Sequence, residues 1–255
     1  MGIARNRTRR RTILIVRVRA TLFAALLCTS TAPLLAQRNS CPTDRPHTLY
    51  SRFAADLEND GKPIVVRSPD RKSSVIAVDV EKSKAPEGVI ARYTVHRGGD
   101  RFVAELDGWD AEILWSPDSS AFAVTQTEGG GGIGYRVYVF YLEQKGVQKV
   151  DVSRAVEAST GLSSHCDGGK FLPNTAVITW LGPQRLLVAA ETFPVGGCKC
   201  PGSFVAYEVN LPDAKIEQSY SQQEAKKKFW SQLGCELRDA DDRCAPTIPA
   251  TQASH

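Results

Sequence analysis

A Ser-Pro-Asp turn between two apolar runs occurs twice in this chain, 48 residues apart. Residues 113–124 read ILWSPDSSAFAV, and residues 64–78 read IVVRSPDRKSSVIAV. Proline at the second turn position presets φ, and the Ser and Asp side chains can hydrogen-bond to the turn backbone. The flanking runs are β-branched, aromatic or alternating, which suits strands. Each copy therefore predicts a hairpin of two antiparallel strands.

A third hairpin keeps this form with other letters, in VITWLGPQRLLVAAET at 177–192. Each of the three hairpins is followed by two more strand-like runs. These runs are 91–97 and 101–106, then 135–142 and 147–153, then 204–210 and 214–220. Twelve strands in three groups of four, at a period of about 40–45 residues plus insertions, are typical of propeller blades.

The stretch Trp115–Asp118, WSPD between two apolar strands, resembles the TolB-type β-propeller repeat, whose hairpin usually reads Trp-Ser-Pro-Asp-Gly. The resemblance covers roughly residues 63–221. Arg67 takes the place of the tryptophan in the first hairpin, and Arg71 and Ser119 stand where glycine is usual. The resemblance implies an all-β, propeller-like array of about three four-stranded antiparallel blades with a short C-terminal helix. A β-sandwich with similar turns is the alternative.

Three blades leave the array open, because propellers typically close with four to eight blades. Open sheet edges have to be covered or paired in a soluble protein. Residues 37–62 and 222–255 could cap the stack, or a degenerate fourth blade could lie within 41–62. Alternatively, two chains could pair into a six-bladed ring, which makes a homodimer the sharper hypothesis.

The first 36 residues are predicted to be a secretory signal peptide. They carry seven arginines and no acidic residue, followed by an apolar run that ends in small residues. An uncleaved membrane anchor is the alternative, but the run is shorter than the about 20 residues that a span needs. We therefore expect a secreted or periplasmic protein with no membrane contact after cleavage.

Removal of the seven arginines changes the charge of the chain. The whole sequence has 32 basic and 28 acidic residues, and without the leader 25 basic residues remain against the same 28, a net charge of −3. A nucleic-acid-binding domain needs a clustered basic face. The composition therefore argues against a nucleic-acid partner.

The predicted organisation has four parts: signal peptide 1–36, lead-in 37–62, propeller-like domain 63–221, and a C-terminal helix and disulfide-bonded tail 222–255. Short helices are expected at 152–159 and 221–234, since both contain good helix formers. In the second helix, Phe229 and Trp230 are both expected to face the end of the blade stack.

Six cysteines remain after the leader, and an even number in an exported chain favours disulfides. They are Cys41, Cys166, Cys198, Cys200, Cys235 and Cys244. Fifteen pairings are possible; a bridge from Cys166 to Cys198 or Cys200 and a Cys235–Cys244 loop are both reasonable. Zinc bound by His165 and three cysteines is the other interpretation, but C-x-C is not the usual zinc spacing. We expect no metal and no cofactor.

Strand order predicts where a binding site lies. If the Ser-Pro-Asp turns join the first and second strands of each blade at one end, the remaining long connections all lie at the opposite end, called the loop end below. These connections are glycine-rich or bear cysteines, and loops on a rigid scaffold commonly carry function. Five weak candidates for ligand binding lie in them: Trp109, Gly129, Gly131, Gly134 and His165.

These candidates favour binding and do not favour catalysis. Trp109 offers an aromatic contact surface in a polar loop. Gly129, Gly131 and Gly134 formally match a dinucleotide fingerprint, but such a fingerprint must open a helix, and an alternating strand follows here. We expect an exported interaction module, not an enzyme, that binds a protein partner or a small ligand. The alternatives are a hydrolase in which His165 acts with Asp167, and an assembly protein that pairs through open blade edges.

Overall fold

The computed structural model describes residues 49–56, 63–80, 90–107, 109–129, 133–144, 146–160, 164–166, 169–193 and 197–243. The chain divides into two compact units, Met1–Gln37 and Arg38–His255, and every described residue belongs to the second. The predicted signal peptide therefore lies outside the described residues. None of the helices that the structure describes is long and apolar enough to cross a membrane.

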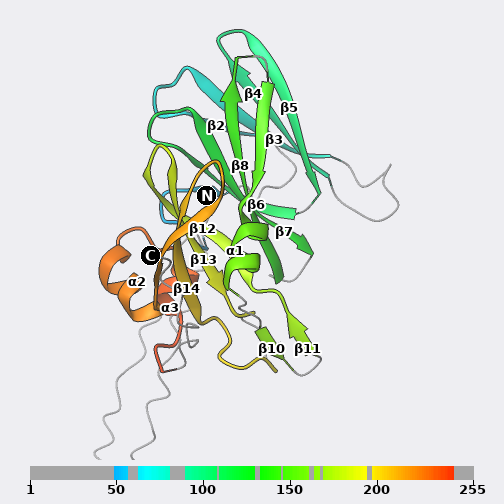
Figure 1. Cartoon of the computed structure of the whole chain (residues 1–255). Coiled ribbons are helices and arrows are strands. Elements are labelled where there is room, and N and C mark those ends of the chain that lie inside the picture. Colours follow the sequence, from blue (N-terminus) through cyan, green and yellow to red (C-terminus); the bar gives the residue numbers. More distant parts are fainter. Residues whose placement is uncertain are drawn as a thin grey trace, which may run out of the picture. The chain divides into compact units, whose positions relative to one another are not determined.

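Three antiparallel sheets form the fold, as predicted for an all-β array (Figure 1). The first sheet contains β2 (Ile64–Arg67), β3 (Ser73–Val80), β4 (Ile90–Arg97) and β5 (Asp100–Asp107). The second contains β6 (Trp109–Trp115), β7 (Ala121–Gly129), β8 (Ile133–Glu143) and β9 (Gly146–Asp151), with β1 (Ala55–Asp56) added beside β6. The third contains β12 (Asn174–Gly182), β13 (Arg185–Glu191), β14 (Phe204–Asn210) and β15 (Lys215–Tyr220). The four-strand grouping is confirmed, and the sheets do not close into a ring.

The two Ser-Pro-Asp turns have the same hydrogen bonds. In the second sheet, the Ser116 hydroxyl donates to Asp118 Oδ1 at 2.7 Å and accepts from the Ala121 amide at 2.9 Å. In the first sheet, Ser68 Oγ donates to Asp70 Oδ1 at 2.6 Å and accepts from the Ser73 amide at 3.0 Å. Each serine thus ties both sides of its turn together, as the motif predicts.

The residue after the aspartate has a left-handed backbone in both turns. Arg71 has φ 62° and Ser119 has φ 63°. This conformation explains why glycine is usual at this position of the repeat, since only glycine adopts it without steric cost. Ser119 has a second contact, because its hydroxyl accepts the Asp70 amide of the preceding hairpin at 3.0 Å.

Tryptophan at the end of the first strand joins each sheet to the one before it. Trp115 Nε1 donates to the Val66 carbonyl of the first sheet at 3.2 Å, and Trp180 Nε1 donates to the Leu114 carbonyl of the second sheet at 3.1 Å. Arg67 occupies the equivalent position in the first sheet and is exposed. A tryptophan therefore occupies this position in the second and third sheets, each of which has a preceding sheet. The first sheet has no preceding sheet among the described residues, and it lacks the tryptophan.

Apolar side chains fill the spaces between successive sheets. One cluster joins the first and second sheets around Tyr93 and Phe140, and a second joins the second and third sheets around Val139 and Val188. The opposite face of the third sheet is also covered: Ile178 and its neighbours pack in a third cluster that includes helical residues. The array thus has a core on both sides of its last sheet.

Helices follow the second and third sheets. Helix α1 (Val152–Thr160) confirms the expectation at 152–159. Helix α2 (Gln222–Phe229) begins with a capping box formed by Ser221 and Glu224, and the short α3 (Cys235–Asp239) follows. The prediction for the two aromatic residues was half wrong: Phe229 is buried, whereas Trp230 is 52% exposed. The reason is the helical period: Trp230 keeps a helical backbone, and consecutive residues of a helix point about 100° apart, so Trp230 cannot share the face of the buried Phe229.

The segment 49–56 completes the cap together with α2 and α3. Tyr50 is buried among residues of these helices and the third sheet. Its carbonyl accepts the Gly234 amide at 2.8 Å, and the Leu49 carbonyl accepts the Glu236 amide at 3.0 Å. Ser51 forms an antiparallel bridge with Leu233. Residues before the first sheet and after the third are therefore joined on one face of the array.

We expect Gly234→Ala to destabilise the protein by about 1–3 kcal/mol, the usual range for overpacking. A Cβ at this position would meet the Tyr50 amide nitrogen at 2.6 Å and the Leu49 carbonyl more closely still. Both are backbone atoms and cannot rotate away. Urea unfolding measures the loss, and Gly146→Ala is the matched control because a Cβ there meets nothing within 4 Å. Equal stability of the two variants would contradict this account of the cap.

Candidate functional site at the loop end of the sheets

The end of the sheets opposite to the Ser-Pro-Asp turns holds the candidate site. At this end β7 stops at Gly129 and β8 starts at Ile133, while β12 starts at Asn174 and β13 stops at Glu191. These strand ends come from both the second and the third sheet. The predicted loop end is therefore a place where segments distant in sequence meet.

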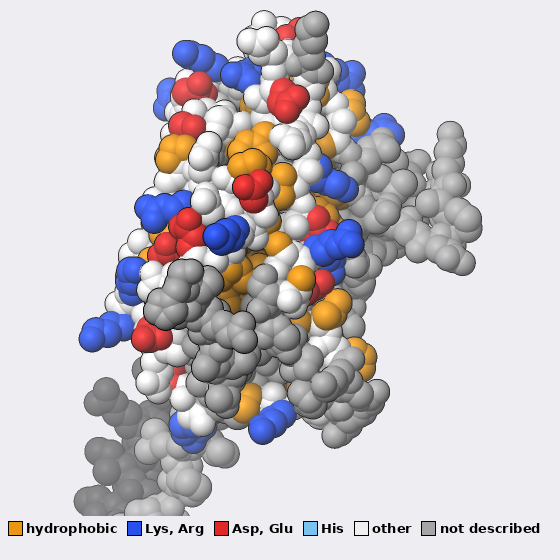
Figure 2. All heavy atoms as spheres, in the orientation of Figure 1, with side chains coloured by type: hydrophobic (Ala, Val, Ile, Leu, Met, Phe, Trp, Pro, Cys, Tyr) orange, Lys and Arg blue, Asp and Glu red, His pale blue; other side chains and the backbone are white. Residues whose placement is uncertain are grey.

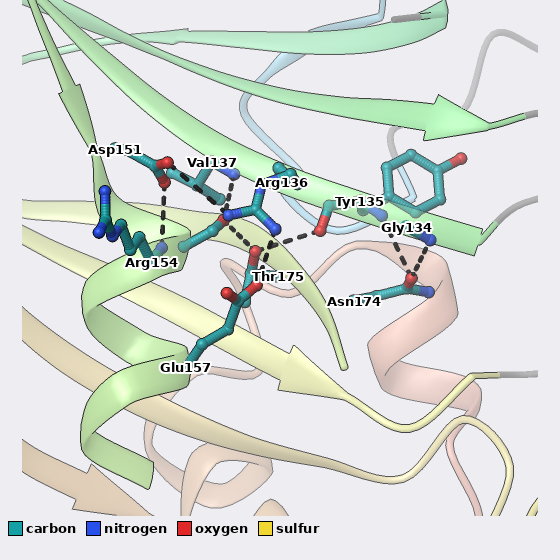
Figure 3. A network of polar contacts seen from close by, with 10 residues as sticks. Gly134, Tyr135, Arg136, Val137, Asp151, Arg154, Glu157, Asn174 and Thr175 are labelled. Atoms are coloured by element: carbon teal, nitrogen blue, oxygen red, sulfur yellow. Dashed lines mark hydrogen bonds and ion pairs between the residues drawn. The ribbon is translucent and has the colours of Figure 1, made fainter. Parts of the chain in front are cut away.

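Asn174 connects three of these segments. Its Oδ1 accepts the backbone amides of Gly134 at 2.9 Å and Tyr135 at 3.2 Å (Figure 3). Its Nδ2 donates to Glu191 Oε2 at 3.1 Å and to the Tyr50 hydroxyl at 3.4 Å. Because the side chain is fully buried, these bonds fix the second sheet, the third sheet and the N-terminal segment relative to one another.

Glu191 is a fully buried carboxyl group in the same cluster. Its Oε2 also accepts the Tyr50 hydroxyl at 3.0 Å, whereas its Oε1 has no hydrogen-bond partner among the described residues. Burial and the nearby charge of Glu236 raise the pKa of Glu191 to about 8, although the bonds from Asn174 and Tyr50 act in the opposite direction. The group is therefore mostly protonated at neutral pH.

A second polar network holds α1 against the neighbouring strands (Figure 3). Ser153 and Thr175 share a hydrogen bond between their hydroxyls, and Ser153 Oγ accepts the Val137 amide at 2.6 Å. Next to these bonds, the part-buried Arg136 pairs with Glu157 at 2.9 Å and with Asp151 at 3.7 Å. These contacts keep the second and third sheets in register next to the loop end.

A small hairpin projects from this end. Strands β10 (Ser164–Cys166) and β11 (Gly169–Phe171) pair with each other, with His165 opposite Lys170. Sequence reasoning treated this stretch as a loop, although the Asp-Gly pair between the two strands is a strong hairpin signal. The loop end therefore includes a regular two-stranded hairpin in addition to the ends of the larger sheets.

Apolar side chains are exposed where this hairpin joins the third sheet. Phe171 is 42% exposed and Leu172 is 54% exposed. The Phe171 ring lies 5.7 Å from the ring of Phe193, which belongs to the connection after β13. Two adjacent exposed apolar side chains beside a second aromatic ring make a contact surface that single scattered residues do not.

Of the five predicted binding residues, the structure describes four, three on the second sheet and one on the β10–β11 hairpin. Trp109 lies at the start of β6 opposite Thr127, and Gly129 lies opposite Ile133. Gly134 has φ 79° and donates to Asn174, so the backbone requires glycine there. His165 lies on the separate β10–β11 hairpin. The strand bounds place these four at the loop end, and among them only Gly134 contacts the buried cluster through a described hydrogen bond.

Some predicted residues lie outside the described part of the chain, or have side chains outside it. Gly131 is not described, and the structure describes only the backbone of Trp109, Gly129 and His165. Their roles in binding stay predictions. The same holds for the hydrolase alternative, which needs the side chain of His165 and Asp167.

The cysteines cluster partly at the loop end. Cys198 and Cys200 follow Phe193, and Cys235 opens α3; all three are disulfide-bonded. Cys41 and Cys244 lie outside the described residues, as does the side chain of Cys166, so the pairing stays a prediction. Within the described ranges, no group of three or more His, Cys, Asp or Glu side chains could hold a metal ion.

Residues that sequence reasoning missed dominate the site. Asn174 and Glu191 stand at strand ends in apolar runs, and Tyr50 comes from a segment with little strand signal. No local pattern marks a buried carboxyl group whose partners lie 17 and 141 residues away. The Asp-Gly turn in the sequence could have indicated the hairpin that leads to Phe171 and Leu172. The residue types of Phe171 and Leu172 gave no indication that their side chains are exposed.

Basic and acidic side chains are mixed on the surface that Figure 2 shows. On the face of the molecule in Figure 2, lysine and arginine side chains are scattered among acidic and apolar ones. The described residues of this face form no clustered basic patch of the kind that binds a nucleic-acid backbone.

No protein-family model matches the sequence, and no curated protein matches it. Among solved structures, an acylaminoacyl peptidase of Pyrococcus horikoshii aligns with 66% of this chain at 11% sequence identity and a TM-score of 0.34. The chain spans only 25% of the length of that peptidase. A likeness at this level carries no argument about fold or activity.

Proposed function

We propose that this protein is an exported interaction module, built from TolB-type propeller-like blades, that binds a partner protein through its loop end. The single observation that supports this most is the exposure of Phe171 and Leu172, by 42% and 54%, on a hairpin at that end. Apolar side chains next to one another on a projecting element are typical of protein-binding sites.

The surroundings of the hairpin suit such a role. The connection after β13 packs against it through Phe193 and is held by the disulfide-bonded Cys198 and Cys200. Below it, the Asn174 cluster fixes the sheets. Contact residues supported in this way lose little conformational entropy on binding. Rigid support beneath exposed apolar residues therefore favours recognition of a partner.

Replacement of both apolar residues tests the proposal. Phe171→Ser with Leu172→Ser is expected to remove at least one partner that the unchanged protein retains from an extract of its source cells, with a loss of affinity of tenfold or more. Mass spectrometry of the retained proteins, followed by titration of the purified partner, measures this. Phe53→Ser is the control, since Phe53 is 60% exposed elsewhere. Retention of the same proteins by the double variant would contradict the proposal.

A further inference from the structure

Glu191 lies where the N-terminal segment 49–56, the second sheet and the third sheet meet. It is fully buried, and its Oε2 accepts hydrogen bonds from the Tyr50 hydroxyl at 3.0 Å and from Asn174 Nδ2 at 3.1 Å. Its Oε1, which is also buried, has no hydrogen-bond partner among the described residues. One oxygen of this carboxyl group thus has two donors, and the other has none to stabilise a negative charge.

The cap does not supply a positive charge that could compensate an ionised Glu191. Glu236 of α3 is a second acidic group nearby, and its charge adds to burial in raising the pKa of Glu191. The two part-buried basic side chains of α2 and α3 have other partners. Arg238 donates to a backbone carbonyl at 2.7 Å, and Lys226 pairs with Asp242 at 2.8 Å. Ionisation of Glu191 therefore requires that water reaches its free oxygen.

Glu112, the other buried carboxyl group at the N-terminal segment, differs in this respect. Its Oε1 accepts the Tyr50 amide at 3.2 Å, and its Oε2 accepts the Ser51 amide at 3.3 Å. Burial and the charge of Asp56 oppose its ionisation, but a charged acceptor binds such donors more tightly than a neutral one. Ionised Glu112 therefore keeps a donor on each oxygen in the closed structure, whereas ionised Glu191 lacks one.

Asn174 connects Glu191 to the start of β8. Its Nδ2 bonds to Glu191 and to the Tyr50 hydroxyl, while its Oδ1 accepts the amides of Gly134 at 2.9 Å and Tyr135 at 3.2 Å (Figure 3). The rings of Tyr50 and Tyr135 also pack edge to face, with 5.1 Å between their centroids. Because a single buried amide group makes these four bonds, it cannot turn toward entering water without releasing the first residues of β8.

The exposed apolar residues of the loop end are attached to the same two polar residues. Leu172 lies two positions before Asn174, and Phe193 lies two positions after Glu191. The Phe193 ring packs against Phe171 at 5.7 Å. Asn174 and Glu191 are themselves opposite each other at the ends of β12 and β13. Loss of the contact between them therefore loosens the base of this apolar surface.

We propose that Glu191 is a proton-operated latch for the loop end. With its proton, it holds the side chains of Tyr50 and Asn174 together, and the N-terminal segment and the loop end form one packed unit. Loss of the proton draws water to Oε1, displaces Tyr50 and loosens the base of the exposed apolar surface. The closed state holds a proton that the open state releases, so a rise in pH favours opening. A weaker hold on a partner at high pH rests on the proposed function, whereas the latch itself needs no partner.

Residue-resolved hydrogen exchange of the purified protein between pH 6 and pH 8 tests the latch without a partner. After correction for intrinsic exchange rates, the opening constants at the Gly134 and Tyr135 amides should rise with pH together with that at Arg52, whose amide bonds to the cap at 2.9 Å. The Ser116 amide, bonded at the opposite end of the second sheet, should have an opening constant about tenfold or more below these, because the opening is local. Opening of the N-terminal segment without Gly134 and Tyr135, or equal opening constants at all four amides, would overturn the proposal.

Glu191→Gln tests the role of the proton. The glutamine keeps an oxygen that can accept the bonds to Oε2 and cannot ionise. The rise of the opening constants at Gly134 and Tyr135 should therefore become smaller by about tenfold per pH unit, the effect of one titrating proton. Glu217→Gln, at an exposed position, is the control and should keep the full rise. The full rise in Glu191→Gln as well would overturn the proposal.

Tyr50→Phe tests the connection between the N-terminal segment and the loop end. It keeps the ring that packs against Tyr135 and removes the hydroxyl that donates to Glu191. At pH 6 the opening constant at the Gly134 amide should rise about two- to tenfold, as expected for the loss of one hydrogen bond. Tyr141→Phe is the matched control and should leave this amide unchanged, since the Tyr141 hydroxyl has no partner among the described residues. An equal opening constant at Gly134 in both variants would overturn the proposal.

Discussion

Raising the pH from 5 to 9 is expected to lower the free energy of unfolding by several kcal/mol. Two buried carboxyl groups, Glu112 and Glu191, cause this loss, because burial raises the pKa of each from 4.5 to about 8. We therefore expect pH to be one of the solution conditions that change the free energy of unfolding of this protein most.

The direction follows from the protons that each state binds. Between pH 4.5 and pH 8 the native state keeps two protons that the unfolded chain releases, so stability falls as the pH rises. The contribution is fully present below the unfolded pKa and is lost as the pH passes through the folded pKa. Each pKa unit corresponds to 1.36 kcal/mol, which gives at most about 5 kcal/mol per carboxyl group.

The loss should begin in the N-terminal segment, since both carboxyl groups bind it. Glu112 accepts the Tyr50 amide at 3.2 Å and the Ser51 amide at 3.3 Å, and Glu191 accepts the Tyr50 hydroxyl at 3.0 Å. An ionised Glu191 would leave a buried charge with an unpartnered Oε1. Release of this segment admits water and relieves that cost, so local opening should precede global unfolding.

Urea unfolding at pH 5, 7 and 9 measures the effect, with hydrogen exchange of the segment 49–56 as the local measure. Glu191→Gln should be about as stable as the unchanged protein at pH 5, because the amide oxygen can accept the bonds from Tyr50 and Asn174 and the end that lacks a partner is the same in both. Its stability should depend less on pH. Glu217→Gln, at an exposed position, is the control and should keep the full dependence. An unchanged pH profile in Glu191→Gln would show that this carboxyl group does not titrate in the range.

The sequence predicted the strands better than it predicted what holds them together. The Ser-Pro-Asp turns and the spacing of the apolar runs are local signals, and they located the four consecutive strands of each of the three sheets. Even the departure from the repeat was informative, because Arg67 stands where the described residues contain no preceding sheet to accept an indole N–H. Local chemistry is sufficient for such features, since neighbouring residues in the chain form them.

The cap and the buried cluster could not be predicted in the same way. Tyr50, Asn174 and Glu191 are brought together by contacts over 17 to 141 residues, and none of them has an unusual local context. Gly234 is the last residue of the helix predicted at 221–234, whereas its structural role is to let the Leu49 backbone pass close by. Close approach of distant backbones leaves no periodic pattern in a sequence.

Loss of the tryptophan that joins the second and third sheets is the other large effect we expect. Trp180 is 8% exposed, packs with Leu186 and Val188, and bonds to the Leu114 carbonyl at 3.1 Å. Trp180→Ala should therefore cost about 3–5 kcal/mol, the usual range for a buried aromatic side chain. Trp180→Phe keeps most of the packing and loses the N–H donor, so it should cost about 1–3 kcal/mol.

The repeat supplies an internal control for this prediction. Trp115→Ala removes the same kind of contact between the first and second sheets, made at 3.2 Å to Val66, and should cost about as much as Trp180→Ala. Arg67→Ala changes the same repeat position on the uncovered first sheet and should stay within about 0.5 kcal/mol. Urea unfolding gives all three values. A large loss in Arg67→Ala would mean that this position is covered in the monomer, and the distinction between inner and terminal blades would then be wrong.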